Sequence, residues 1–130
     1  MDYYRDMKTH HKRKIRPNAP SGLCCRGRIW IEKDGETFLG TGRIVLLSKI
    51  KEMGSISKAA KSMQMSYKRA WDLVDAVNRH AGQPLVITSK GGKGGGGAAL
   101  TKRGEEIVRE FNELLGQFHQ FLDEKTITLP

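Results

Sequence analysis

The chain has 130 residues, with 23 Lys and Arg against 14 Asp and Glu and a formal net charge of +9. This length suits about one domain, which excludes a catalytic domain joined to a separate regulatory domain. No apolar run reaches the ~18 residues of a membrane-spanning helix, and the polar, basic first 20 residues do not resemble a secretory signal. We therefore expect a cytoplasmic protein. Its basic balance indicates a polyanionic partner, which is DNA, RNA or an anionic membrane surface, and charge alone does not choose among them. The motifs described below favour DNA, so no membrane partner is expected.

The positive charge is concentrated in the middle of the chain. Residues 41–104 hold twelve Lys and Arg against three Asp and Glu, whereas residues 105–130 hold two against six. This asymmetry assigns the polyanion-binding surface to the middle of the chain and not to its C-terminal part. Residues 1–20 lack a hydrophobic period and are expected to form a mobile basic arm that precedes a folded domain over residues 21–130.

The pattern over residues 27–40 predicts a short β hairpin. Apolar and polar side chains alternate through residues 29–32, and Asp34 with Gly35 forms a typical hairpin turn. Trp30 is expected to be a core or interface aromatic, with a ligand-stacking role as the alternative.

Helical spacing of apolar residues follows in three successive segments, predicted at residues 42–53, 55–63 and 66–80. Ser55 and Ser66 stand at the start of the second and third segments, where hydroxyl side chains cap helices. A short capped helix, a tight turn and a second capped helix form a helix-turn-helix.

The second helix of such a motif lies in the major groove of DNA and presents its N-terminal residues to base edges. Here these residues are Ser66, Tyr67, Lys68 and Arg69, whose hydroxyls and cations suit phosphate and base-edge contacts. Arg69 suits a bidentate contact to guanine. Tyr67 has the alternative of packing on the helix beneath it, and Trp71 is expected to pack at the core edge and not against a base.

Residues 84–100 predict two strands joined by a glycine-rich tip, which is the wing of a winged helix. Glycines allow backbone amides to approach phosphates closely, and Lys90 and Lys93 supply charge. The DNA-facing set is completed by Lys102, after the second strand, and by Ser57, for which capping is the alternative role.

The glycine run also satisfies the G-x-G-x-x-G pattern between residues 92 and 97. A dinucleotide site needs, in addition, an acid about 20 residues further on, where this chain has Gln117. A P-loop needs Ser or Thr directly after its Gly-Lys pair, where this chain has Gly94. No nucleotide cofactor is therefore expected.

Residues 101–124 predict a long helix that is capped by Thr101 and carries Glu105 in its early turns, where the helix dipole favours an anion. An apolar stripe runs along this helix. The stripe is too long for so small a body to cover, so we expect a homodimer seam, with plain core packing as the alternative. The expected seam residues are Ile107, Phe111, Leu114, Leu115, Phe118, Phe121 and Leu122.

No arrangement of residues indicates catalysis or metal binding. The sequence offers no nucleophile with a partner base and no paired acids in a pocket-forming context. The four His residues lack metal-ligand spacing, and the adjacent Cys24 and Cys25 lack the further ligands that zinc requires. We expect no enzyme activity, no cofactor and no metal site.

Three motifs stand out when they are taken together. They are GSISKAA at residues 54–60, MSYKRAW at residues 65–71, and GGKGGGGA at residues 91–98 followed by Leu100 and Thr101. This combination resembles the N-terminal DNA-binding domain of the molybdate-responsive transcriptional regulators (the ModE family) and, more distantly, the LysR-type winged helix. The resemblance covers about residues 27–124 and implies a dimeric bacterial regulator whose first and last helices form the dimer interface, with Ser66, Tyr67, Lys68, Arg69 and Lys93 facing DNA.

The expected fold class is mainly α with small β hairpins, as a winged helix-turn-helix with a long C-terminal dimerisation helix. The expected function is a sequence-specific transcriptional regulator that binds double-stranded DNA as a homodimer. The alternatives are a non-specific architectural nucleic-acid binder and a sensor that responds to an oxyanion or small ligand. In the family the molybdate-binding domains follow the DNA-binding domain, and here the sequence ends at Pro130, so molybdate is not expected on this chain alone.

Overall fold

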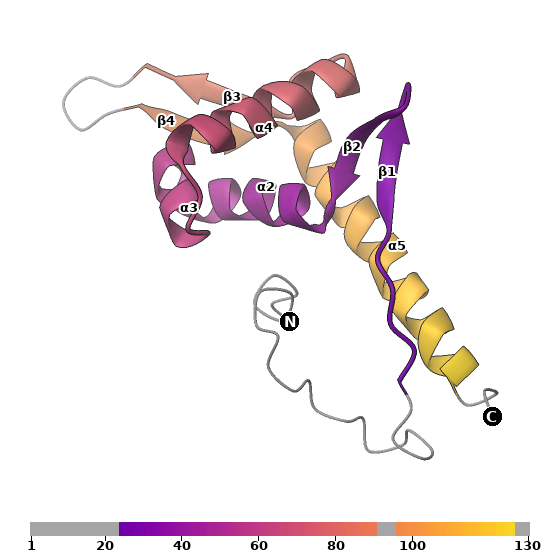
Figure 1. Ribbon diagram of the computed structural model, residues 1–130. Coiled ribbons are helices and arrows are strands. Elements are labelled where there is room, and N and C mark those ends of the chain that lie inside the picture. Colours follow the sequence, from indigo (N-terminus) through magenta and orange to yellow (C-terminus); the bar gives the residue numbers. More distant parts are fainter. Residues whose placement is uncertain (1–23, 91–95, 127–130) are drawn as a thin grey trace.

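The computed structural model describes residues 24–90 and 96–126 of the chain. The expected fold class, a mainly helical winged helix-turn-helix with small β hairpins, is confirmed (Figure 1). In chain order the described elements are β1 (Trp30–Lys33), β2 (Glu36–Gly40), α2 (Thr41–Met53), α3 (Ile56–Ser62), α4 (Tyr67–Ala81), β3 (Val86–Ser89), β4 (Gly97–Leu100) and α5 (Lys102–Thr126).

The bounds of α2, α3 and α4 differ from the expected helices by at most one residue at either end. The wing strands are shorter than the expected segment of residues 84–100, and α5 ends at Thr126, beyond the expected residue 124. Two expectations lie outside the described residues, namely the basic arm of residues 1–20 and the glycine tip that contains Lys93.

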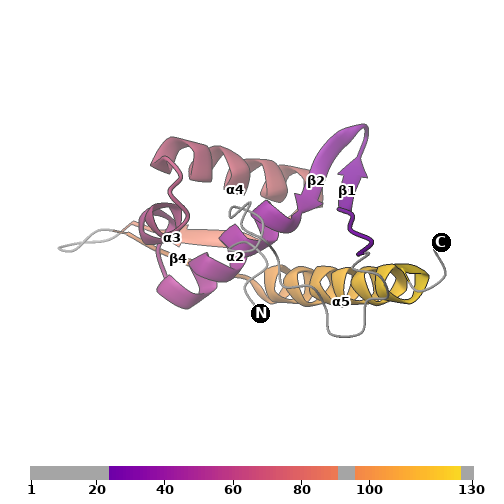
Figure 2. The ribbon, with the colours of Figure 1, turned by 60° about the horizontal axis from the view of Figure 1, so that its bottom comes forward.

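The recognition elements and the long last helix lie at opposite ends of the molecule. The N-terminal end of α4 and the β3–β4 hairpin share one end, and α5 leads away toward the other (Figures 1 and 2). The central helix is α2, which packs against α3, α4, α5, β2 and β4. Its apolar face is buried at Ile44, Leu46, Leu47 and Ile50.

The β1–β2 hairpin forms as expected, with a turn in which Asp34 and Gly35 have φ values of 52° and 81°. Ile31 packs against the core, whereas Trp30 on the opposite face of the strand is 58% exposed. Of the two expected roles of Trp30, the core role is therefore wrong, because the alternation of the strand turns its ring to solvent, and the interface role stays a prediction. Its indole Nε1 donates a hydrogen bond to Glu32 Oε1 at 3.0 Å.

The same hairpin is fastened to the C-terminal end of α4. The half-buried His80 places Nε2 3.2 Å from Glu36 Oε2, and its ring lies 6.2 Å from that of Phe38, centroid to centroid. Lys33 Nζ donates to the carbonyl oxygen of His80. Since the last carbonyls of a helix lack intrahelical partners, this contact also satisfies one of them.

The N-terminal half of α5 is part of the core. Ile107, Phe111 and Leu115 are buried against the other helices, with exposed fractions of 9%, 2% and 5%. These three residues pack against the body of their own chain and are therefore removed from the expected dimer seam. Leu114 and Phe121 remain 43% and 53% exposed.

The C-terminal half of α5 extends beyond the body, and the segment that precedes β1 runs beside it (Figure 1). A Cβ atom on Gly27 of that segment would lie 2.9 Å from Phe118 Cζ and 3.5 Å from Leu122 Cδ1. Phe118 and Leu122 are accordingly only partly exposed. The two positions of the stripe left open to a second chain are therefore Leu114 and Phe121.

The first turn of α5 is packed tightly against the start of β3. Thr101 caps α5 as expected, since its Oγ1 accepts a hydrogen bond from the Gly104 amide at 3.0 Å. The Thr101 amide donates to the Leu85 carbonyl oxygen at 2.9 Å. A Cβ atom on Gly104 would lie 2.2 Å from that same Leu85 oxygen, so only glycine fits at this position.

Gly104→Ala is expected to destabilise the fold by about 1–3 kcal/mol, because the added methyl meets backbone atoms that cannot rotate away. This penalty exceeds the gain of up to about 1 kcal/mol that alanine gives a helix interior over glycine. Gly116→Ala in the same helix is the matched control, since nothing lies within 4 Å of its Cβ position. Thermal unfolding followed by circular dichroism should show a lower Tm for Gly104→Ala and an equal or higher Tm for Gly116→Ala; an unchanged Tm for the first would contradict the contact.

Candidate nucleic-acid interface

The α3–turn–α4 unit is held by two serine caps. Ser55 Oγ accepts from the Lys58 amide and Ser66 Oγ from the Arg69 amide, both at 3.1 Å. Gln64 in the turn has a φ of 54°, in the left-handed region. The small side chains of Ala59 and Ala60 on α3 are buried at 0% and 2% exposure, as the close packing of α3 against its neighbours requires.

The exposed face of α4 carries two ion pairs and no net charge. Lys68 Nζ lies 3.0 Å from Asp72 Oδ2, and Arg79 Nη1 lies 3.5 Å from Asp75 Oδ2. Steps of three and four residues place all four side chains on one face, opposite the buried face of Ala70, Val74 and Val77. Exposed pairs of this kind contribute little to stability, so both donors and acceptors are available to a ligand.

Arg69 lies on the flank of α4 that faces the β1–β2 hairpin, since it shares a side of the helix with His80 three turns later. Near it is Arg43 of α2, whose Nη1 donates to the Thr37 carbonyl oxygen at 2.8 Å. Burial lowers the pKa of Arg43, and the charge of Arg69 lowers that pKa further. The two guanidinium groups thus form a cationic edge beside the neutral central face.

An aromatic pair lies on the opposite flank of α4. The rings of Tyr67 and Trp71 meet edge to face, with centroids 6.2 Å apart and an interplanar angle of 83°. Tyr67 is 55% and Trp71 38% exposed. Trp71 thus keeps most of its surface covered, as expected at the edge of the core, with more than a third of it open to solvent, whereas more than half of Tyr67 is exposed.

Asn78 joins this flank of α4 to the wing. Its Oδ1 accepts from the amides of Leu85 and Val86 at 2.8 and 3.1 Å, and its Nδ2 donates to the Val86 carbonyl oxygen at 3.1 Å. Asn78 was not among the functional residues expected from the sequence. The available signal was an asparagine inside a helix, where such a side chain is disfavoured unless it bonds elsewhere.

The remaining expected DNA-facing residues are distributed over three elements. Ser57 is exposed on α3 and, since Ser55 makes the cap, its hydroxyl is left facing solvent. Lys90 is exposed after β3, Lys102 is exposed at the start of α5, and Lys93 lies outside the described residues. The wing is tied to the α2–α3 corner through the Ala98 amide, which donates to the Gly54 carbonyl oxygen at 2.9 Å. Lys58 and Lys61, both exposed on α3, were not among the expected residues.

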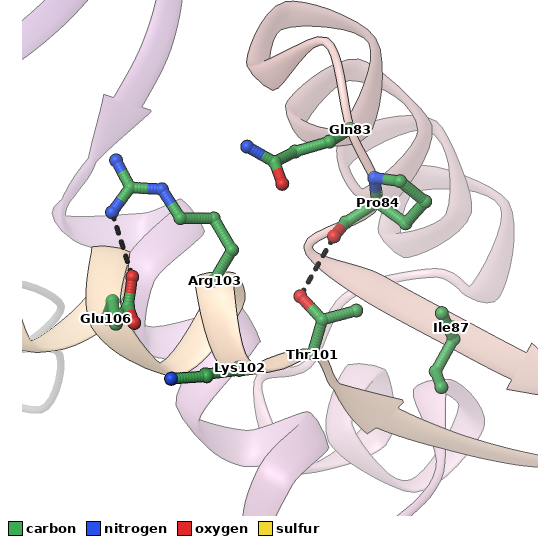
Figure 3. Close-up of a pocket in the computed structure, with 7 residues that line it drawn as sticks. All are labelled: Gln83, Pro84, Ile87, Thr101, Lys102, Arg103 and Glu106. Carbon is green, nitrogen blue, oxygen red and sulfur yellow. Dashed lines mark hydrogen bonds and ion pairs between the residues drawn. The ribbon is translucent and has the colours of Figure 1, made fainter.

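A shallow cleft of about 470 Å³ lies where the wing meets α5 (Figure 3). Arg103 Nη1 is held 3.1 Å from Glu106 Oε2, and Thr101 Oγ1 donates to the Pro84 carbonyl oxygen at 2.9 Å. Because these polar groups already bind one another, we interpret the cleft as the region of contact between the wing and α5. It is lined by Gln83, Pro84, Ile87, Thr101, Lys102, Arg103 and Glu106.

Within residues 24–90 and 96–126, no three His, Cys, Asp or Glu side chains are grouped closely enough to hold a metal ion. None of the helices in these ranges is long and apolar enough to cross a membrane.

Asn78→Ala is expected to lower the free energy of unfolding by about 1–3 kcal/mol for each buried amide that it leaves without a partner. The amides are those of Leu85 and Val86, which are 0% and 3% exposed. Asn112→Ala, at an exposed position of α5, is the control and should change stability little. Urea unfolding measures both, and hydrogen exchange should show earlier opening of β3 in Asn78→Ala alone; equal stability of the two variants would contradict the role of Asn78.

Comparison with known proteins finds several that are similar to this chain in sequence. Residues 42–105 match the family model described as bacterial regulatory helix-turn-helix protein, lysR family. The molybdenum transport protein ModE of Azotobacter vinelandii is 42% identical over 96 residues, which are 74% of this chain and 36% of that protein. The DNA-binding transcriptional dual regulator ModE of Escherichia coli K12 is 43% identical over 83 residues, which are 64% of this chain and 31% of that protein.

The molybdenum-pterin-binding protein MopB of Rhodobacter capsulatus is 42% identical over 93 residues, which are 72% of this chain and 34% of that protein. This chain thus spans about a third of the length of these relatives. The solved structure of ArgP from Mycobacterium tuberculosis has a TM-score of 0.47 and 18% identity, over 64% of this chain and 29% of that one.

The matched region is therefore similar to the LysR-type bacterial helix-turn-helix, and in the structure it folds as a winged helix-turn-helix. Both hydrogen-bonded serine caps and the α3–α4 corner lie inside the match. More narrowly, the chain is similar over this region to proteins named ModE, in line with the motif resemblance.

Proposed function

We propose that this chain is a sequence-specific transcriptional regulator that binds double-stranded DNA as a homodimer and has no catalytic role. In this proposal α4 lies in the major groove and the β3–β4 wing contacts the phosphate backbone. The relationship to proteins named as ModE regulators supports DNA binding as the activity.

One observation carries the proposal: the solvent face of α4 combines paired donors and acceptors, and the N-terminal end of this helix lies at the same end of the molecule as the wing. A groove-binding helix needs such a face, because base edges present both donors and acceptors. The central face has no net charge, so attraction to phosphate is assigned to its surroundings. These are the Arg43–Arg69 edge, the exposed lysines of α3, and Lys90 and Lys102.

The proposed dimer uses the open edge of the α5 stripe. Leu114 and Phe121 are seven residues apart, which places them on one edge of the helix, and both are exposed in the single chain. An isologous contact of two α5 helices covers these side chains and relates two copies of α4 by a two-fold axis. Two half-sites about one helical turn of DNA apart, or a multiple of it, are then expected.

Substitutions at Arg69 and Lys90 separate base contacts from phosphate contacts. Arg69→Ala is expected to reduce the preference for a selected site over random DNA by about tenfold, because a bidentate base contact contributes about 1–3 kcal/mol of discrimination. Lys90→Ala, and likewise Lys93→Ala, should weaken selected and random DNA alike and reduce the slope of log Kd against log salt by about 0.9. Fluorescence anisotropy titrations at several salt concentrations measure both effects.

Arg109→Ala is the matched control, because it removes the same charge from an exposed position on α5. It should leave both the site preference and the salt slope unchanged. Equal affinity of the native chain for selected and random DNA would instead favour the non-specific architectural binder. A slope that falls as much for Arg109→Ala as for Lys90→Ala would contradict a local wing contact.

Phe121→Glu is expected to convert the dimer into a folded monomer, because burying a carboxylate in an apolar seam carries a desolvation penalty that pairing with Lys125, whose Nζ lies 5.5 Å from the centroid of the Phe121 ring, does not offset. The side chain is 53% exposed in the single chain, so the fold itself should survive. Asn112→Glu adds the same charge at an exposed position of α5 outside the stripe and should leave the dimer intact. Sedimentation equilibrium gives the mass and circular dichroism the fold; a dimeric Phe121→Glu would rule out this seam.

A further inference from the structure

We propose that Trp71, oriented by Tyr67, is a specificity-determining residue that recognises the 5-methyl group of thymine in the major groove. The inference rests on the proposed function, because it assigns a chemical preference to the α4 surface. It differs from the expectation for Trp71 based on sequence, which placed this ring at the edge of the core.

The outward-facing surfaces of Tyr67 and Trp71 are not covered by the rest of the chain. Tyr67 and Trp71 do not belong to the set of buried or partly buried apolar residues that form the core. They are 55% and 38% exposed in the first two turns of α4, at the end that a groove-binding helix presents to bases. Large aromatic rings are most often buried or engaged by a partner, so two exposed together at this end indicate a contact surface.

The aromatic pair lies between the wing and the exposed face of α4 that carries Lys68 and Asp72. Trp71 precedes Asn78 by seven residues, or two helical turns, so the two side chains share a flank of α4. Asn78 bonds directly to the Leu85 and Val86 amides at the base of the wing. The ring of Trp71 therefore lies between the Lys68–Asp72 face and the wing, toward the wall of a groove that α4 occupies.

The major groove determines which groups of the DNA an aromatic side chain on α4 can contact. In a duplex the faces of the bases are stacked on one another, so a side chain in the major groove meets base edges. Among these edges the thymine methyl is the apolar group, and apolar side chains contact it. The edge-to-face contact with Tyr67 fixes the orientation of the indole before binding, which lowers the entropy lost on complex formation.

The test removes single methyl groups from the DNA. A site is first selected from random duplexes with the native chain, and each thymine is then replaced in turn by deoxyuridine. At one or two thymines in each half-site, the replacement is expected to weaken binding about three- to fivefold, which corresponds to one buried methyl group. Trp71→Ala should bind the thymine and deoxyuridine forms of those positions equally, while its response at every other thymine matches that of the native chain.

Trp30→Ala is the matched control, because it removes an exposed indole from the β1–β2 hairpin, outside the proposed DNA-facing set, and should retain the sensitivity to deoxyuridine. Circular dichroism checks that Trp71→Ala is folded. If the native chain tolerates every deoxyuridine, or if Trp71→Ala keeps the full sensitivity, the inference is overturned and the proposed function stands. If no sequence is enriched in the selection, both are overturned. Binding of single-stranded oligothymidine that is as tight as duplex binding and is lost in Trp71→Ala would show a base-stacking platform and overturn methyl recognition.

Discussion

The geometry of the DNA-facing surface depends on the backbone of Leu85, where three elements meet. Its amide is bound by the Asn78 side chain of α4, and its carbonyl oxygen accepts from the Thr101 amide that leads into α5. Gly104 approaches the same oxygen so closely that no side chain fits between them. Leu85 is itself 0% exposed. The recognition helix, the wing and the long helix are thus joined at one buried residue, and none of them can shift alone without breaking a hydrogen bond there.

The distribution of charge in the folded domain differs from what a net charge of +9 suggests. The middle of the exposed α4 face is electrically balanced by its two ion pairs, and the unbalanced cations surround it on α2, α3 and the wing. Such a division separates two tasks. In the proposed complex, charges at the periphery would provide affinity that depends on salt and not on sequence, and a balanced centre with directional groups would provide discrimination.

Local signals were sufficient to predict the fold class and the helix bounds. Ser55 and Ser66 cap their helices through groups three residues away, so a short stretch of sequence contains both partners. The role of Asn78 was not predictable in this way, because its partners are placed by the packing of the wing against α4. The stripe on α5 posed a related problem: Phe111 and Leu114 have the same apolar character, and only the position of the body decides which of them is covered.

The β1–β2 hairpin would affect the spacing of the two DNA half-sites that a dimer binds. It is fastened to the last turn of α4 through His80 and Glu36, and the segment that precedes it rests on Phe118 and Leu122 of α5. The C-terminal end of α4 is thereby held in place relative to α5, the helix that would form the interface of the proposed dimer. In the proposed dimer, a helix held in this way would not move independently of its partner copy. The separation of the two half-sites would then be set by the protein, and the DNA would have to match it by its own twist and bend.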